Sequence, residues 1–427
     1  MSVLNRYQGM EDLLNNPEEG GAAGIIVEGS GDAAVETVKA EVAEAMAELE
    51  QVSAEVQELR ADLEEHEEVV EELQEEVAGQ EAMLSGASTF SAAAFAHSYN
   101  KSLRLHAKLG GESLTRMGAE SISDAATAKI AAVTGQEGFM ESIKNGAKKA
   151  IEFIKHIFNT VINFFVGLFS SAEGLNRRRA QLEEKLKKAE KLKDKVKLGQ
   201  WNIGVDYVKN GADILDKGPF TKVLAEALPA FIESGKNLDG INASGFKSAY
   251  GALIAAVKEV IKDVAGTPSE KSDKSDKRQV LAARAGFSIY LAYEDKYETE
   301  EEILAAARSV KLSFGKTEGA KEFAKGEEVD VKASKAQLQG LLNTVASSVS
   351  VMRDSKITQK FSKAERDRVV ATLTVKTKEN ASTKEENGKA IQLVRALYST
   401  GSSLTVSMNK LFVAQGKQAL DLVAAHI

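Results

Sequence analysis

The residues that could do chemistry are few and scattered along this chain of 427 residues. There is no cysteine, which excludes thiol nucleophiles, disulfides and thiolate zinc sites. No HExxH spacing, Walker loop or G-x-S-x-G turn occurs. The five histidines are isolated from one another: His66, His97, His106, His156 and His426. We therefore predict that the protein is not an enzyme and has no catalytic residue, metal site or cofactor.

Charge, rather than reactive groups, distinguishes the parts of the chain. Residues 1–137 contain 27 acidic and 8 basic residues, a net charge of −19, whereas residues 138–427 contain 36 acidic and 47 basic residues, a net charge of +11. An asymmetry of this size predicts either an intramolecular partner or two parts with different destinations.

The acidic part is dominated by a heptad repeat. Residues 1–32 are Gly-rich and predict a flexible leader. From Val35 to Leu84 the seam positions are apolar except His66 and Gln80, which predicts a long coiled-coil helix over 33–84. This helix needs a partner: either a basic helix or, through the coiled coil, a second copy of the chain.

The segment 85–137 is rich in small residues and predicts a connector with one or two short helices. An amphipathic helix follows, with lysines near its start and a broad apolar stripe. The stripe includes Ile154, Phe158, Ile162, Phe165 and Phe169. Either this stripe is core, or it can contact a membrane interface.

A basic run follows the Phe-rich helix. Its cations include Arg177, Arg178, Arg179, Lys185, Lys187 and Lys188. Three interpretations remain open: a solvated helix face, a site for phosphate groups, or a docking surface for the acidic helix.

The remaining chain continues with helical patterns. We predict a basic helical body over 138–265, a polar linker over 266–279 and a C-terminal helical domain over 280–427. No apolar stretch reaches the roughly 18–20 uninterrupted residues of a spanning helix. The predicted fold class is all-α, a long N-terminal coiled-coil helix followed by a helical-bundle body, with over half of the residues helical.

Triplets of a small residue, any residue and glutamate lie between the acidic and basic parts. The favoured junction is Gly135-Gln136-Glu137, followed by Gly138, with alternatives ending at Glu81 and Glu120. An acidic low-aromatic leader, such a junction and a basic helical body together resemble the internal head proteins of large or giant tailed bacteriophages.

The resemblance implies a protein of the capsid interior that is in the host cytoplasm during assembly. It also implies capsid or scaffold proteins as partners and non-specific contact with packaged DNA. In this family a prohead protease cuts after such triplets and removes an acidic propiece, and some members are ejected into the host. The same residues also allow a second functional interpretation: an α-helical pore-forming toxin or secretion-system translocator that inserts 138–171 into membranes, with transient membrane contact.

Overall fold

A computed structural model describes residues 32–118, 122, 124–198, 203–210, 217–235, 241–272, 277–284, 287–316, 328–353, 356–380 and 386–427. Helices account for 78% of these residues, so the predicted all-α class is confirmed. The leader predicted at 1–32 lies, except for Asp32, outside the described residues.

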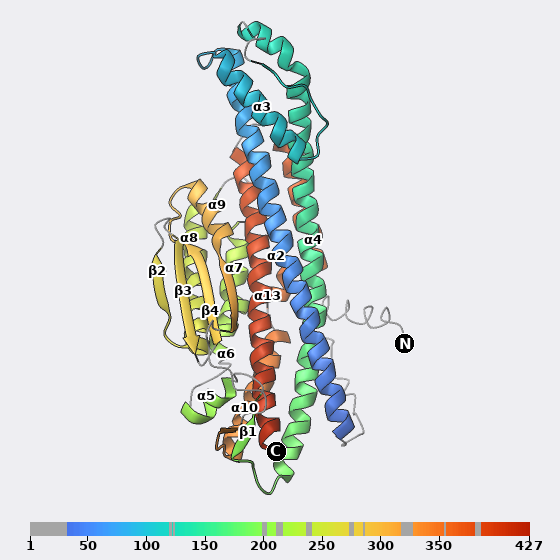
Figure 1. The fold of residues 1–427 in the computed structure, drawn as a ribbon, viewed down its shortest axis with the longest axis vertical. Helices are drawn as coiled ribbons and strands as arrows, with labels where there is room; N and C mark the ends of the chain where they lie inside the picture. The colour runs from blue at the N-terminus through green and yellow to red at the C-terminus, as the bar shows by residue number, and fades with distance from the viewer. Residues whose placement is uncertain are drawn as a thin grey trace.

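Three long helices run along the long axis of the molecule (Figure 1). They are α2 (Asp32–Ser85), α4 (Ala125–Lys188) and α13 (Glu386–His426). Thr160 of α4 donates to Glu55 of α2 at 3.1 Å, and His66 of α2 lies 3.1 Å from the Gly146 carbonyl oxygen of α4. Residue numbers rise in one helix as they fall in the other, so α2 and α4 are antiparallel. The partner of the acidic helix is therefore within the same chain.

Shorter helices complete the bundle. The helix α3 (Ala92–Lys108) packs against the ends of α2 and α4 that lie at the top of Figure 1. Along the rest of α4 lie α10 (Lys335–Arg353) and α12 (Lys363–Asn380), which α11 (Ile357–Lys360) connects.

A smaller unit flanks the bundle and contains a four-stranded antiparallel sheet in the order β2-β3-β4-β5. Its elements are α5 (Ile203–Asn210), α6 (Lys217–Thr221), the π-helical turn η2 (Lys222–Ala227), α7 (Leu228–Glu233), α8 (Ala243–Ala265), β2 (Ser269–Ser272), β3 (Lys277–Arg284), β4 (Phe287–Glu294), α9 (Glu300–Ser309) and β5 (Lys311–Lys316).

The sheet differs from the helical pattern predicted after residue 279. The segment 266–279, predicted as a polar linker, contributes β2 and the start of β3. Val280, Leu291 and Leu312 are paired across three strands and are buried, and this face of the sheet packs on α8 and α9. Short strands with one buried face have a period of two, which helical spacing does not reveal.

The apolar core has two parts. The main part joins α4, α13 and the smaller unit, and α2 contributes Leu49, Val56 and Leu63 to it. The second part lies where α2, α3 and α4 meet, and includes Phe95 and Phe139. The acidic helix is thus a structural part of the body.

The helix α13 is buried on nearly all sides despite many hydroxyl side chains. Ser402 donates to the Tyr398 carbonyl oxygen and Thr405 to that of Gly401, each at 2.7 Å. Such bonds to the preceding turn satisfy polar groups within the helix itself. This explains how a Ser/Thr-rich sequence forms a central helix.

Candidate polyanion-binding surface and processing sites

The basic run ends in a fixed turn at one end of the molecule. After α4 the chain forms β1 (Lys195–Lys197), which pairs with β6 (Glu328–Asp330). The Lys193 amide donates to the carbonyl oxygen of His426 at 2.9 Å, and Val196 is buried. At the lower end of Figure 1, the end of α4, β1 and the C-terminus therefore lie together.

Exposed lysines concentrate at this end. Residues 187–197 and 328–335 contain eight lysines and four acids. Lys187 pairs with Glu183 at 3.1 Å, while Lys195 and Lys197 lie opposite Asp330 and Glu328 in the strand register. Between Lys187 and β1, three exposed lysines form no ion pair with a described residue: Lys188, Lys191 and Lys193. We call these three the terminal lysine cluster.

The arginine triplet does not form a common surface. Arg178 is 3% exposed and donates from Nη2 to Asp421 of α13 at 2.7 Å. Arg179 pairs with Glu183 at 2.8 Å, whereas Arg177 is exposed. The structure therefore uses Arg178 to join two helices, and this side chain is not accessible to a polyanion. Its spacing from the seam residues Leu175 and Leu182 was the signal for this placement.

Two of the predicted cations neutralise a carboxylate within α4. A hydrogen bond from Lys187, with a further contribution from Arg179, lowers the pKa of Glu183 from its ordinary value. Lys185 also has an interaction within the structure. Of the six predicted cations, Lys188 is exposed and forms no ion pair with a described residue, whereas Arg177 is exposed but has an interaction partner within the structure.

The apolar stripe of α4 faces the protein. Ile154, Phe158 and Phe165 are buried, and Ile162 and Phe169 are half-buried. The Phe158 ring lies 5.0 Å from that of Tyr398, measured between centroids. Within the described residues, the helical stretch Gly135–Lys188 has the length and the apolar composition that a membrane span requires. In this structure the stripe is core.

The favoured processing junction lies within a helix. Glu137 and Gly138 are in α4, Gln136 is half-buried, and Gly135 is buried against the Tyr99 ring, where a Cβ atom would clash with it. The contact with Tyr99 gives this glycine a packing role.

The two alternative junctions differ from each other. Glu81 lies in α2, beside Gln80, which is buried and donates to Ser102 at 2.8 Å. Glu120 lies outside the described residues, and the segment 111–118 before it has no regular secondary structure.

A buried ion-pair network was not predicted from the sequence. Glu67 of α2 accepts from Arg308 of α9 at 3.0 Å and from Arg395 of α13 at 3.3 Å. Burial lowers the pKa of Arg395, and the Glu67 carboxylate opposes that change. Arg60, seven residues before Glu67, donates to the Val310 carbonyl oxygen at 3.0 Å. Arg60 and Glu67 are one heptad apart beside the apolar seam of α2, and this spacing was the sequence feature that could have indicated the network.

The fold and these surfaces define an elongated α-helical structural protein. The described residues contain no group of histidine and acidic side chains that could hold a metal ion. A family model of phiKZ-like phage internal head proteins matches residues 44–425, and the chain belongs to that family. The resemblance to internal head proteins of large phages is thereby confirmed, and the protein is a structural component inside the phage head. Neither the curated proteins nor the solved structures contain a match.

Proposed function

We propose that this internal head protein lies against the packaged genome through the terminal lysine cluster. The observation that carries the proposal is the exposure of Lys188, Lys191 and Lys193 without ion pairs among the described residues, at one end of the molecule. Lysines that contact phosphates release condensed counterions, and this gives affinity without base recognition. Non-specific binding suits a protein that is packed beside a whole genome.

The acidic helix limits this affinity. The chain carries a net charge of −8, and α2 lies along α4. The bound orientation must therefore direct the lysine end toward DNA and keep the acidic face of α2 away from it.

The family resemblance implies proteolytic processing, and we infer that the cut leaves the folded structure intact. Removal of residues 1–137 would take Leu49, Val56 and Leu63 from the main core. We therefore propose that cleavage occurs between α3 and α4, after Glu120, and that the acidic fragment stays bound to the body. Exposed segments without secondary structure are the usual sites of proteolysis. Contact with capsid or scaffold proteins during assembly in the host cytoplasm, and ejection with the genome, belong to the same proposal and rest on the resemblance.

Salt-dependent DNA binding tests the proposal. The triple variant K188Q/K191Q/K193Q should bind duplex DNA more weakly, and the slope of log K against log salt should fall by about 0.9 for each phosphate that the protein no longer neutralises. The matched control is K222Q/K262Q/K271Q, which removes the same charge from exposed positions on the smaller unit. An equal drop in affinity for both variants would show that net charge, rather than this surface, determines binding.

A further inference from the structure

The first half of α4 carries an exposed apolar stripe that the proposed function does not use. Ile130, Val133 and Met140 are 80%, 49% and 41% exposed, and they are three of the five exposed large apolar side chains in the described residues. Their spacing of three and seven places them on one face of the helix. A single exposed apolar side chain needs no explanation, but three aligned on one helix face indicate a contact surface.

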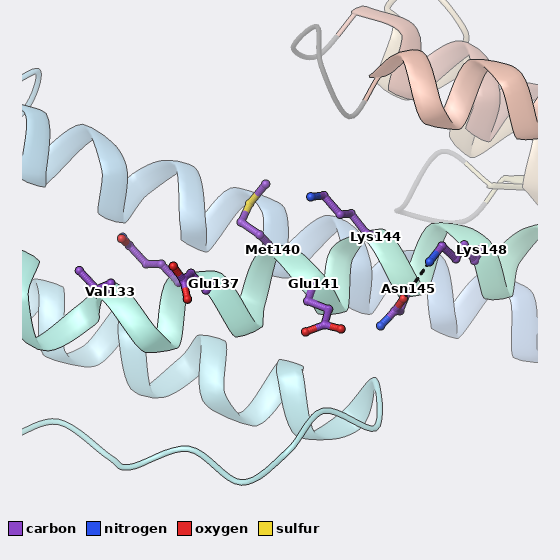
Figure 2. A pocket seen from close by; sticks show the side chains of 8 residues that line it. Val133, Glu137, Met140, Glu141, Lys144, Asn145 and Lys148 are labelled. Atoms are coloured by element: carbon purple, nitrogen blue, oxygen red, sulfur yellow. Dashed lines mark hydrogen bonds between the residues drawn. The ribbon is translucent and has the colours of Figure 1, made fainter.

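A shallow groove follows this face (Figure 2). Its volume is about 640 Å³, which lies in the range of small-molecule sites. All of its lining residues belong to α4, and they are Val133, Gln136, Glu137, Met140, Glu141, Lys144, Asn145 and Lys148. A groove lined by one helix has no opposing wall to enclose a small molecule. An elongated surface, such as another helix, fits it better.

Charges along the groove change sign in the middle. Glu137 and Glu141 line its first half, and Lys144 and Lys148 follow them on the same face. All four are exposed, and none forms an ion pair with a described residue. Lys148 has a long contact of 3.4 Å to Asn145. The groove is thus acidic in one half and basic in the other.

We propose that this groove binds the same groove of a second copy of the chain, with the two α4 helices antiparallel. In a twofold-symmetric antiparallel contact, a residue a given number of positions before the axis meets the residue the same number of positions after the axis in the other copy. With the axis between residues 142 and 143, Glu141 meets Lys144 of the second copy and Glu137 meets Lys148. The charge pattern is therefore complementary to itself, and Met140, which lies close to the axis, supplies an apolar contact with Met140 of the second copy.

The structure also restricts where self-association can occur. A second copy of the chain was one of the two partners that the sequence left open for the seam of α2, but Val56 and Leu63 on that seam are buried within the chain. The groove of α4 remains open in the same molecule. This inference does not depend on DNA binding or on processing.

A charge-exchange experiment on the full-length protein tests the pairing. Wild-type protein should form dimers in sedimentation equilibrium. E137K/E141K and K144E/K148E should each weaken dimerisation about tenfold or more, because each places like charges opposite one another. An equimolar mixture of the two variants should recover dimers as heterodimers, because every pair then joins opposite charges.

Controls separate this interface from general effects of charge. E65K/E68K changes two exposed acids on α2 and should leave dimerisation unchanged. M140D should weaken dimerisation and leave the circular dichroism spectrum unaltered, since Met140 is exposed. The proposal is overturned if wild-type protein is monomeric up to about 100 µM, or if the mixture of charge variants forms no more dimer than either variant alone.

Discussion

The ion-pair network at Glu67 makes a sharp prediction about stability. The carboxylate joins three helices, since it accepts from Arg308 of α9 and from Arg395 of α13. Side-chain exposure is 4% for Glu67, 7% for Arg395 and 20% for Arg308. The substitution E67Q preserves the shape of the side chain and removes its charge. Arg395 then keeps its charge in an apolar setting without a counter-ion.

The size of the effect follows from this burial. Removal of one member of a buried pair costs about 3–5 kcal/mol, because the remaining charge is not compensated. The contact of Arg395 with Glu67 is long, at 3.3 Å, and Arg308 is partly hydrated. Both facts place the expected loss at the low end, about 3 kcal/mol in the free energy of unfolding.

Urea unfolding followed by circular dichroism measures this loss. The matched control is E50Q, on the same helix, because Glu50 pairs with Lys410 of α13 at 3.6 Å but is 78% exposed. An exposed pair contributes about 0–1 kcal/mol, so E50Q should change stability little. The double variant E67L/R395L should be destabilised less than E67Q, because apolar side chains can replace a buried pair at little cost. If E67Q and E50Q unfold at the same urea concentration with the same slope, the network does not stabilise the fold as described.

Two further predictions concern the contact between α2 and its neighbours. A Cβ atom at Gly146 would lie 2.5 Å from Cγ2 of Val70, so G146A should lower the free energy of unfolding by about 1–3 kcal/mol in the same urea assay. At Gly79 an added methyl group meets nothing within 4 Å, so G79A should raise the free energy of unfolding by up to about 1 kcal/mol. Burial would raise the pKa of Glu76, but hydrogen bonds from Lys101 and Ser98 hold it below its ordinary value of 4.5. Because the folded pKa is the lower one, this stabilisation is present above pH 4.5 and disappears as the pH falls through the folded pKa. Hydrogen exchange of α3 should accelerate in that acidic range in wild-type protein, and K101M should reduce the pH dependence; an identical pH dependence in both proteins would contradict the assignment.

The long helices were the predictable part of this fold. Heptad spacing identified α2 because its seam is apolar over many turns, and the Ile/Phe stripe identified α4. The sequence did not reveal that α2 packs on α4 of the same chain, since a heptad specifies a seam but not its partner. Gly135 likewise matched a processing triplet, whereas its burial against Tyr99 appears only in the folded chain.

The candidate polyanion-binding surface could be predicted only in part, because long-range contacts decide which cations are exposed. The spacing of Arg178 from the buried Leu175 and Leu182 places it on the side of α4 that faces the core, but nothing near it in the sequence identifies its partner. That partner is Asp421, 243 residues away. Lys193 became part of the surface only because the chain turns after α4 and is held by the end of α13. Long-range contacts of this kind have no local signature.

Cross-linking in intact phage heads tests the central claim most directly. Formaldehyde joins lysine side chains to adjacent DNA, and mass spectrometry of the cross-linked peptides identifies the lysines that lie against the genome. DNA-filled heads that contain this protein should give cross-links at Lys188, Lys191 and Lys193, and DNA-free proheads should not. Cross-links confined to lysines of the smaller unit, or the same pattern with and without DNA, would contradict the assignment of this end of the molecule to the genome.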